Sequence, residues 1–277
     1  MTLKYVANKD NILSLELKEL ISKHLYKSIK AHKFPIYING VEKKLYENIK
    51  QNDVITIDYV VEKESDWPLY PSDIEILYED EDYLVVNKRR NLLSIPKVSE
   101  QKSLYQEILY YFSLKGKSPI ISIITRLDKK TSGLVVVALN KVAASNLSPV
   151  HEKITRRYYA LLDGVLQNDN GKIITHIKKE EDSIKRYVSD DGQIAISNYK
   201  AIKRYDDKTL VEFELETGRT HQIRVHSKYL GHPVLGDDLY ADYDGDLYLT
   251  SHYVNFKNLK NETVEIDISS WWENEEK

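Results

Sequence analysis

The stretch Ile124-Thr-Arg-Leu-Asp-Lys-Lys-Thr-Ser-Gly-Leu-Val-Val-Val-Ala138 decides the fold, because it joins a polar turn to an uninterrupted apolar run. The run over 133–139 has the length and the β-branched residues of a buried strand. The turn before it carries Arg126 and Asp128, so a carboxylate is held on a rigid element. An aspartate before a strand is commonly only a turn or capping residue. The rest of the chain has to decide between the two interpretations.

Strand patterns recur on both sides of this stretch, with few helical patterns between them. Short turns, rather than a helix each time, separate several of the strands, which favours an α+β fold over a doubly wound parallel sheet. We therefore predict a mixed, largely antiparallel central sheet. The expected strands are 84–87, 133–139, 158–162, 172–177, 194–202, 209–215 and 221–226, and the expected helices are 103–114 and 141 to about 150.

The first sixty residues predict a separate small domain. Leucine and isoleucine recur mostly at spacings of three and four between residues 14 and 32, which predicts one or two short amphipathic helices. A short strand then ends at the turn Asn39-Gly40, and a second strand follows at 54–59. Lysines outnumber glutamates between residues 18 and 50, so this helix-helix-hairpin domain over 1–60 has a locally basic surface. Such a surface is either an RNA-binding footprint or simply solvated.

Residues 61–73, with the sequence VEKESDWPLYPSD, predict a linker. They are charged, contain two prolines and show no periodicity. The larger domain therefore extends over 74–277, and its acidic end at 271–277 is expected to be a surface tail.

Composition excludes several functional classes. The 277 residues include no cysteine, which excludes thiolate nucleophiles and cysteine-ligated metal sites and favours a reducing compartment, the cytoplasm. No signal peptide and no apolar run of roughly 18 residues is present, so we expect no membrane association. The glycines form neither a dinucleotide fingerprint nor a phosphate loop, so we expect no nucleotide cofactor. The spacing of His221, His226 and His232 matches no zinc pattern, and no metal is expected.

Three motifs along the chain resemble those of the RluA-like pseudouridine synthases. The first, Arg126-Leu-Asp-x-x-Thr-Ser-Gly-Leu134, is similar to the catalytic motif, in which the aspartate is essential. The other two are Arg156-x-Tyr-x-Ala-Leu-x-x-Gly164 and Thr217-Gly-Arg-Thr-His-Gln-Ile-Arg-Val-His226, and Gly231-His-Pro-x-x-Gly-Asp237 continues the match. The resemblance covers residues 74 to the 250s in the expected order. The first sixty residues resemble the small ribosomal-S-four-type RNA-binding domain, the alpha-L motif.

The resemblance implies the pseudouridine synthase fold and the isomerisation of uridine to pseudouridine in ribosomal or transfer RNA, without a cofactor. It implies Asp128 as the catalytic carboxylate and Arg219 as its positive partner. Tyr158 would stack on the flipped uracil, Arg126 would fill the space vacated in the RNA, and Ile223 would line the pocket. A carboxylate suits this reaction because it can attack the sugar or stabilise positive charge on it. Attack on the sugar and removal of a ribose proton both remain open.

Two positions depart from the family pattern. Thr125 stands where the family commonly has histidine, and Lys88-Arg-Arg-Asn91 stands where Lys-Pro-x-Gly is expected. These departures concern loop geometry and substrate choice. The alternative functions are a catalytically silent RNA-binding or ribosome-assembly protein and a metal hydrolase that uses the histidines. The intact set of Asp128, Tyr158 and Arg219 favours the isomerase, which we expect to act as a monomer.

Overall fold

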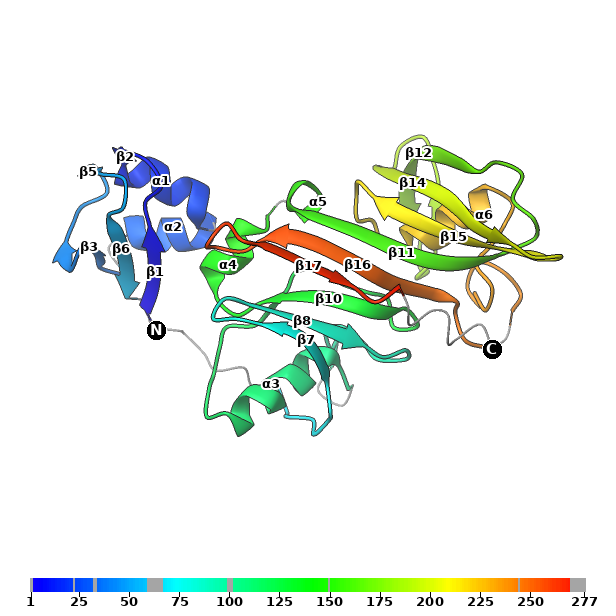
Figure 1. Cartoon of the computed structure of the whole chain (residues 1–277), viewed down its shortest axis with the longest axis horizontal. Coiled ribbons are helices and arrows are strands. Elements are labelled where there is room, and N and C mark those ends of the chain that lie inside the picture. Colours follow the sequence, from blue (N-terminus) through cyan, green and yellow to red (C-terminus); the bar gives the residue numbers. More distant parts are fainter. Residues whose placement is uncertain are drawn as a thin grey trace.

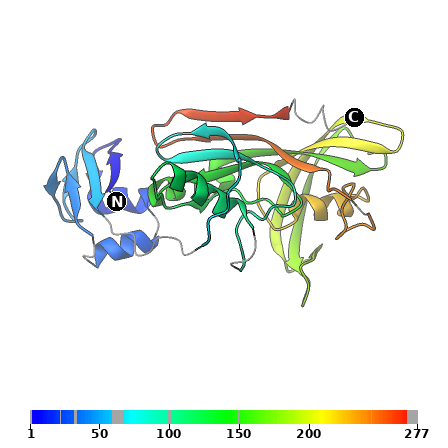
Figure 2. The same cartoon turned by 90° about the horizontal axis from the view of Figure 1, so that it is seen from below.

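The computed structural model describes residues 2–21, 23–31, 34–58, 67–98, 102–148, 150–243 and 245–269. A small N-terminal unit stands at one end of a long, twisted sheet in both views of the chain (Figures 1 and 2). Of the predicted linker, residues 61–66 lie outside the described residues, and 67–73 contain no helix or strand. The predicted tail 271–277 also lies outside them. No helix in the described part of the chain has the length and apolar character needed to cross a membrane.

The N-terminal unit contains the two helices and the hairpin that the sequence predicts. Helices α1 (Leu13–Leu20) and α2 (Lys23–Lys30) pack beside a four-stranded antiparallel sheet. Asn39 and Gly40 both have positive φ, 50° and 82°, as a tight hairpin turn requires. The sheet order is β1 (Thr2–Val6), β6 (Val54–Asp58), β3 (Ile36–Ile38) and β4 (Val41–Glu42), and the short pair β2 (Asn11–Ile12) and β5 (Asn48–Ile49) lies apart from it.

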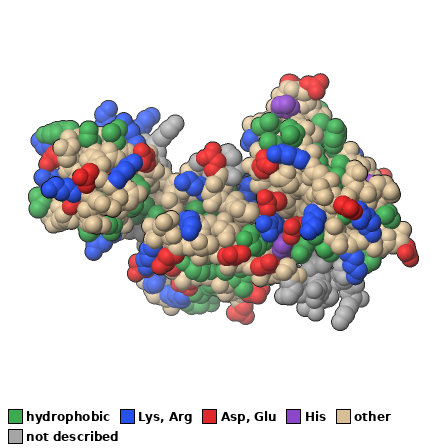
Figure 3. Space-filling model, turned by 45° about the horizontal axis from the view of Figure 1, so that its top comes forward, with side chains coloured by type: hydrophobic (Ala, Val, Ile, Leu, Met, Phe, Trp, Pro, Cys, Tyr) green, Lys and Arg blue, Asp and Glu red, His purple; other side chains and the backbone are tan. Residues whose placement is uncertain are grey.

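The core of the N-terminal unit extends onto the larger domain. Leu17 of α1 and Ile57 of β6 belong to one buried cluster with Val142 of helix α4 (Lys141–Asn146). On the face drawn in Figure 3 this unit, at the left, displays Lys and Arg side chains interspersed with Asp and Glu. On that face the basic side chains are therefore scattered rather than gathered in one patch.

The larger domain is built on an eleven-stranded sheet in which every pair is antiparallel except β10 with β16. The fold class predicted from the sequence, a mixed and largely antiparallel sheet, is confirmed. The main path runs β13 (Arg186–Val188), β12 (Asn170–Lys179), β14 (Gln193–Arg204), β15 (Lys208–Leu215), β11 (Ile154–Asp163), β16 (Leu249–Lys257), β10 (Ser132–Ala138), β8 (Tyr83–Lys88) and β7 (Glu75–Glu79), with β17 (Thr263–Asp267) on β16 and β9 (Ser122–Ile123) on β10.

The parallel contact between β10 and β16 is short and very close. Gly133 has φ of 107°, and a Cβ added to it would lie 2.1 Å from the carbonyl oxygen of Ser251. Only glycine fits there, because both the conformation and the space exclude a side chain. Tyr158 of β11 is paired with the same Ser251 from the other side. The glycine thus brings the loop that carries Asp128 beside the strand that carries Tyr158.

Helices cover the sheet at three places. The predicted helix at 103–114 is α3 (Leu104–Leu114), capped by the side chain of Ser103. The pattern from 141 to 150 divides into α4 and α5 (Val150–Lys153). The predicted strand 221–226 is wrong, because this segment forms α6 (Gln222–Tyr229). Its alternating polar residues are buried against polar partners rather than exposed on one strand face, so the alternation does not report a sheet surface.

Candidate active site

Asp128 lies in the loop between β9 and β10, and the main chain on both sides of it is fixed by hydrogen bonds. The buried hydroxyl of Ser94 donates to the carbonyl of Leu127 at 2.7 Å and accepts the N–H of Leu127 at 3.1 Å. The N–H of Thr131 donates to the carbonyl of Asp128 at 3.2 Å. The carboxylate is therefore presented by a rigid turn, as a reacting group requires.

Thr125, the first departure from the family pattern, has a structural role here. Its side chain is buried, and its hydroxyl oxygen accepts the N–H of Val136 at 2.8 Å. The backbone N–H of Thr125 donates to the carbonyl of Val136 at 3.3 Å. Threonine therefore attaches the loop that carries Asp128 to β10.

The second departure is accommodated by the conformation of Asn91. Asn91 has φ of 60°, which is the left-handed region where glycine is usual and asparagine is the best-tolerated substitute. Lys88, at the start of the same segment, is fully buried. Its Nζ donates to the carbonyls of Arg89, Leu92 and Lys129 at 3.0, 2.9 and 3.3 Å. Lys88 thus ties the turn ending at Asn91 to the residue directly after Asp128.

Burial lowers the pKa of Lys88 to about 7, against the opposing charge of Asp128. We expect Lys88→Met to lower kcat about tenfold or more, since the loop beside the carboxylate loses its anchor and small misplacements are costly.

The buried Lys88 also makes stability depend on pH. Between pH 7 and 10.5, Lys88 is protonated in a larger fraction of unfolded molecules than of folded molecules. The unfolding free energy contributed by this group therefore rises with pH in that window. Denaturant titrations at pH 7 and 9 should show this rise in the wild type and a smaller one in Lys88→Met.

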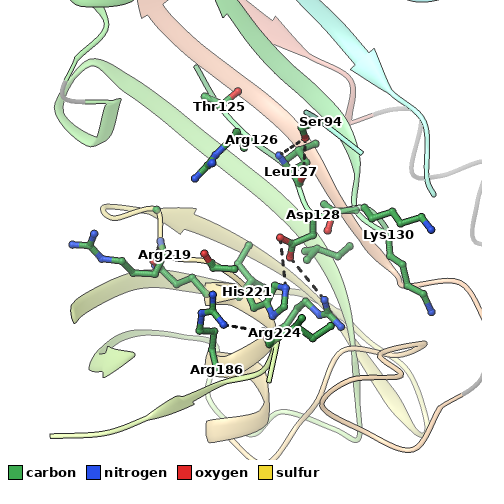
Figure 4. A pocket seen from close by; sticks show the side chains of 18 of the residues that line it. Ser94, Thr125, Arg126, Leu127, Asp128, Lys130, Arg186, Arg219, His221 and Arg224 are labelled. Carbon is green, nitrogen blue, oxygen red and sulfur yellow. Dashed lines mark hydrogen bonds and ion pairs between the residues drawn. The ribbon is translucent and has the colours of Figure 1, made fainter. Parts of the chain in front are cut away.

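The two basic side chains that face Asp128 come from the first turn of α6 and from the residue directly before this helix. Arg224 Nη1 lies 3.9 Å from Asp128 Oδ2, and His221 Nε2 lies 3.9 Å from Oδ1 (Figure 4). Arg224 is 5% exposed and forms a two-bond pair with the fully buried Asp237, Nε to Oδ2 at 2.8 Å and Nη2 to Oδ1 at 2.5 Å. Burial disfavours the charge of Arg224, but its bonds to Asp237 and the charges of Asp237 and Asp128 raise its pKa. A permanent positive charge therefore faces the carboxylate.

Arg219, the positive partner of Asp128 that the resemblance implies, does not lie beside Asp128 in this structure. Its Nε donates to the carbonyl of Ile194 at 2.8 Å, and Figure 4 shows its side chain directed away from Asp128. The reason is the position of the helix: Arg224 lies in the first turn of α6 and His221 is the residue directly before it, whereas Arg219 lies two residues further back in the preceding loop. Recognising a helix rather than a strand would have identified Arg224.

We expect Arg219→Gln to weaken RNA binding about tenfold and to leave kcat nearly unchanged, because the side chain lies at the rim of the cleft. A lost phosphate contact also reduces the slope of log affinity against log salt by about one. Filter binding at several salt concentrations, together with single-turnover rates, measures both. A large fall in kcat at unchanged affinity would place Arg219 beside the reacting atoms instead.

His221 is held by a chain of hydrogen bonds. Its Nδ1 lies 2.7 Å from the hydroxyl of Tyr240, which also accepts the N–H of Arg186 at 2.8 Å. Burial lowers the pKa of His221, the charge of Asp128 opposes this, and the charge of Arg224 adds to the lowering. The lowered pKa favours the neutral form of the imidazole. With the Tyr240 proton donated to Nδ1, the ring proton lies on Nε2 and faces Asp128.

A cleft of about 950 Å³ brings together all the residues that the sequence predicts, Arg126, Asp128, Tyr158, Arg219 and Ile223. Tyr158 and Ile223 are buried in its wall, and Arg126 is exposed at its edge. Burial raises the pKa of Tyr158, so the phenol stays protonated. The chain has a net charge of −3, yet the cleft wall is basic. Its charged residues are Lys97, Arg126, Lys129, Lys130, Arg156, Lys179, Arg186, Arg219 and Arg224 against Asp128 and Asp238.

The three histidines considered as metal ligands serve separate purposes. His226 is buried between Ser197 and Thr175, and burial lowers its pKa to about 4. His232 Nδ1 donates to the carbonyl of Asp163 at 2.7 Å. Within the described ranges no group of three potential ligands is close enough to hold a metal ion.

Known proteins are similar to this chain over the part that contains the cleft. The family described as RNA pseudouridylate synthase matches residues 82–229. The chain is 38% identical over 226 residues to an uncharacterized RNA pseudouridine synthase, YjbO, of Bacillus subtilis, covering 80% of each chain. It is 36% identical over 213 residues to the ribosomal large subunit pseudouridine synthase D of Vibrio cholerae, covering 74% of this chain and 65% of the other. The structure is similar to that of human RNA Pseudouridylate Synthase Domain Containing 1, with a TM-score of 0.60, 26% identity and coverage of 72% and 85%.

Proposed function

The chain belongs to the RNA pseudouridylate synthase family and isomerises uridine to pseudouridine in RNA, and from this premise we propose that it acts on ribosomal RNA with Asp128 as its catalytic carboxylate. The observation that carries the assignment of Asp128 is its position. It is a carboxylate on a fixed turn, facing a permanently charged arginine in a basic cleft. The ribosomal substrate is supported by relatives such as the Vibrio cholerae enzyme, whose name specifies the large ribosomal subunit.

The reaction breaks the bond between ribose and a base nitrogen, turns the base, and joins carbon 5 to the sugar with loss of the carbon-5 proton. It involves no net oxidation, so no redox cofactor takes part. The positive charge of Arg224 faces the Asp128 carboxylate from one side, and the ring of His221 faces it from the other, each at 3.9 Å. The ionised carboxylate can attack the sugar or remove a ribose proton, and both routes begin from this arrangement.

The base must leave its stack before it reacts, which costs a few kcal/mol. Tyr158 in the cleft wall offsets this by stacking on the uracil, worth about 1–3 kcal/mol, with Ile223 beside it. Arg126, exposed two residues before Asp128, is placed to enter the space that the base leaves in the RNA. The cleft therefore combines a reacting carboxylate, an apolar base platform and a cation at its edge.

We further propose that residues 1–60 form an RNA-binding domain of the ribosomal-S-four type, joined by the linker 61–73 to a catalytic domain over 74–277. The helix pair, the Asn39-Gly40 hairpin and the lysines of this unit support the proposal. RNA bound by backbone charge has a strongly salt-dependent affinity. We expect the protein to act as a monomer on cytoplasmic RNA.

The test is tritium release from carbon-5-tritiated uridine in RNA from cells that lack this gene. We expect release from ribosomal RNA, little from transfer RNA, and no effect of a chelator. Release from transfer RNA alone would overturn the ribosomal assignment. No release from either RNA, with RNA binding intact, would favour a catalytically silent RNA-binding protein.

A further inference from the structure

Arg156 is a buried arginine in the wall of the active-site cleft. It lies on β11 two residues before Tyr158, so both side chains project from the same face of the strand. The residue is only 6% exposed. The position places a guanidinium directly beside the platform that we propose for the flipped base.

The structure gives this guanidinium almost nothing to bind. Among the described residues it makes one hydrogen bond, from Nη2 to the carbonyl of Leu215 at a long 3.4 Å, and its buried Nε has no partner there. No carboxylate among the described residues pairs with it. The aspartates of the cleft are engaged elsewhere: Asp128 faces Arg224, and Asp238 pairs with Lys130 at 2.9 Å. A buried charge without a counter-charge is strongly unfavourable, so the free protein retains an unsatisfied site.

The neighbouring Arg157, on the same strand, has partners for its guanidinium. It projects from the opposite face, bonds Glu214 through Nε at 2.7 Å and stacks over the ring of Tyr253 at 4.6 Å. Charge and residue type are equal, and only the environment differs. The contrast separates a stabilising surface arginine from one that faces the substrate cleft.

Gly218 leaves the space that Arg156 occupies. A Cβ added at Gly218 would lie 3.0 Å from Nη1 of Arg156, closer than ordinary side-chain contacts. The loop that carries the Thr-Gly-Arg sequence is therefore packed against the guanidinium and confines it. A cation confined in this way is pre-organised for a ligand.

We propose that Arg156 binds a phosphate of the RNA strand next to the target uridine. This rests on the proposed function, since the substrate must be RNA. Phosphate is the anion that RNA brings into the cleft, and a guanidinium can hold two of its oxygens at once. A uracil carbonyl would accept a hydrogen bond but would leave the charge uncompensated. The contact fixes the strand while Tyr158 receives the base.

The first experiment compares Arg156→Gln with the matched control Arg157→Gln. We expect Arg156→Gln to weaken binding of the ribosomal RNA substrate at least about tenfold, the effect of losing a charge-assisted hydrogen bond, while its Tm without RNA stays equal or rises. Arg157→Gln should bind RNA within about twofold of wild type and have an equal or lower Tm. A Tm of Arg156→Gln several degrees lower, with RNA affinity intact, would show that the arginine is structural and overturn the proposal.

The second experiment asks whether the contact is to phosphate or to base. Short RNAs that contain the target uridine are made with one neutral methylphosphonate in place of a phosphate, either directly before or directly after that uridine. Wild type should lose affinity about tenfold for one of the two, and Arg156→Gln should lose nothing further on that RNA. Equal losses in wild type and variant would refute the phosphate contact. Failure of the proposed function is a different result, absence of tritium release by the wild type itself.

Discussion

Asp128→Asn is expected to reduce pseudouridine formation by at least about 10³-fold, because the amide has neither the negative charge nor the nucleophilic oxygen that the reaction needs. The fold should be unaffected, since the side chain is 28% exposed and the anchors of its loop, Ser94 and Thr131, bond its neighbours and its main chain. RNA affinity should be equal or higher, because a negative charge is removed from a basic cleft. Tritium release and filter binding on the same preparation measure both quantities.

Asp238→Asn is the matched control for this prediction. It makes the same chemical change in the same cleft at a residue that pairs with the surface-accessible Lys130 at 2.9 Å and lies 3.8 Å from Arg224. We expect its rate to fall less than about tenfold. Wild-type activity in Asp128→Asn would rule out the carboxylate mechanism, and equal losses in both variants would mean that cleft charge, rather than one reacting group, controls the rate.

The sequence predicts those parts of the fold where burial follows hydrophobicity. The strands that form β8 and β10 are continuous apolar runs, and the structure confirms them. It does not predict β16, in which Thr250, Ser251 and His252 are buried, because polar residues inside a sheet hide the pattern. The same effect produced the wrong strand at 221–226. Hydrophobic periodicity does not identify the secondary structure where buried residues are polar, and in this protein those residues lie around the cleft.

The candidate site divides in the same way. The motifs bring Asp128, Tyr158 and Ile223 to one cleft, as expected. The partner of Asp128 could not be chosen from the motif alone, because Arg219 and Arg224 are both arginines in it and only the helix start at Gln222 distinguishes them. Whether asparagine can replace the family's glycine at position 91 depends on one backbone angle, the φ of 60° at Asn91. Such choices require three-dimensional geometry rather than residue type.

Arg224→Met is expected to lower the free energy of unfolding by about 3–5 kcal/mol, because it leaves the carboxylate of Asp237 buried without its counter-charge. Asp237 also accepts the N–H groups of Leu239 and Tyr240 at 3.0 and 3.1 Å, so the turn that supports His221 depends on it. Chemical denaturation measures this loss. Activity should fall as well, because Asp128 loses its permanent positive partner.

The double variant Arg224→Met/Asp237→Asn separates the two effects. Removing both charges relieves the buried carboxylate, so most of the lost stability should return, while the charge facing Asp128 remains absent and activity should stay low. Recovery of stability and activity together would mean that Arg224 only supports the fold. Recovery of stability alone means that the arginine acts on Asp128 directly, through the positive charge that faces its carboxylate.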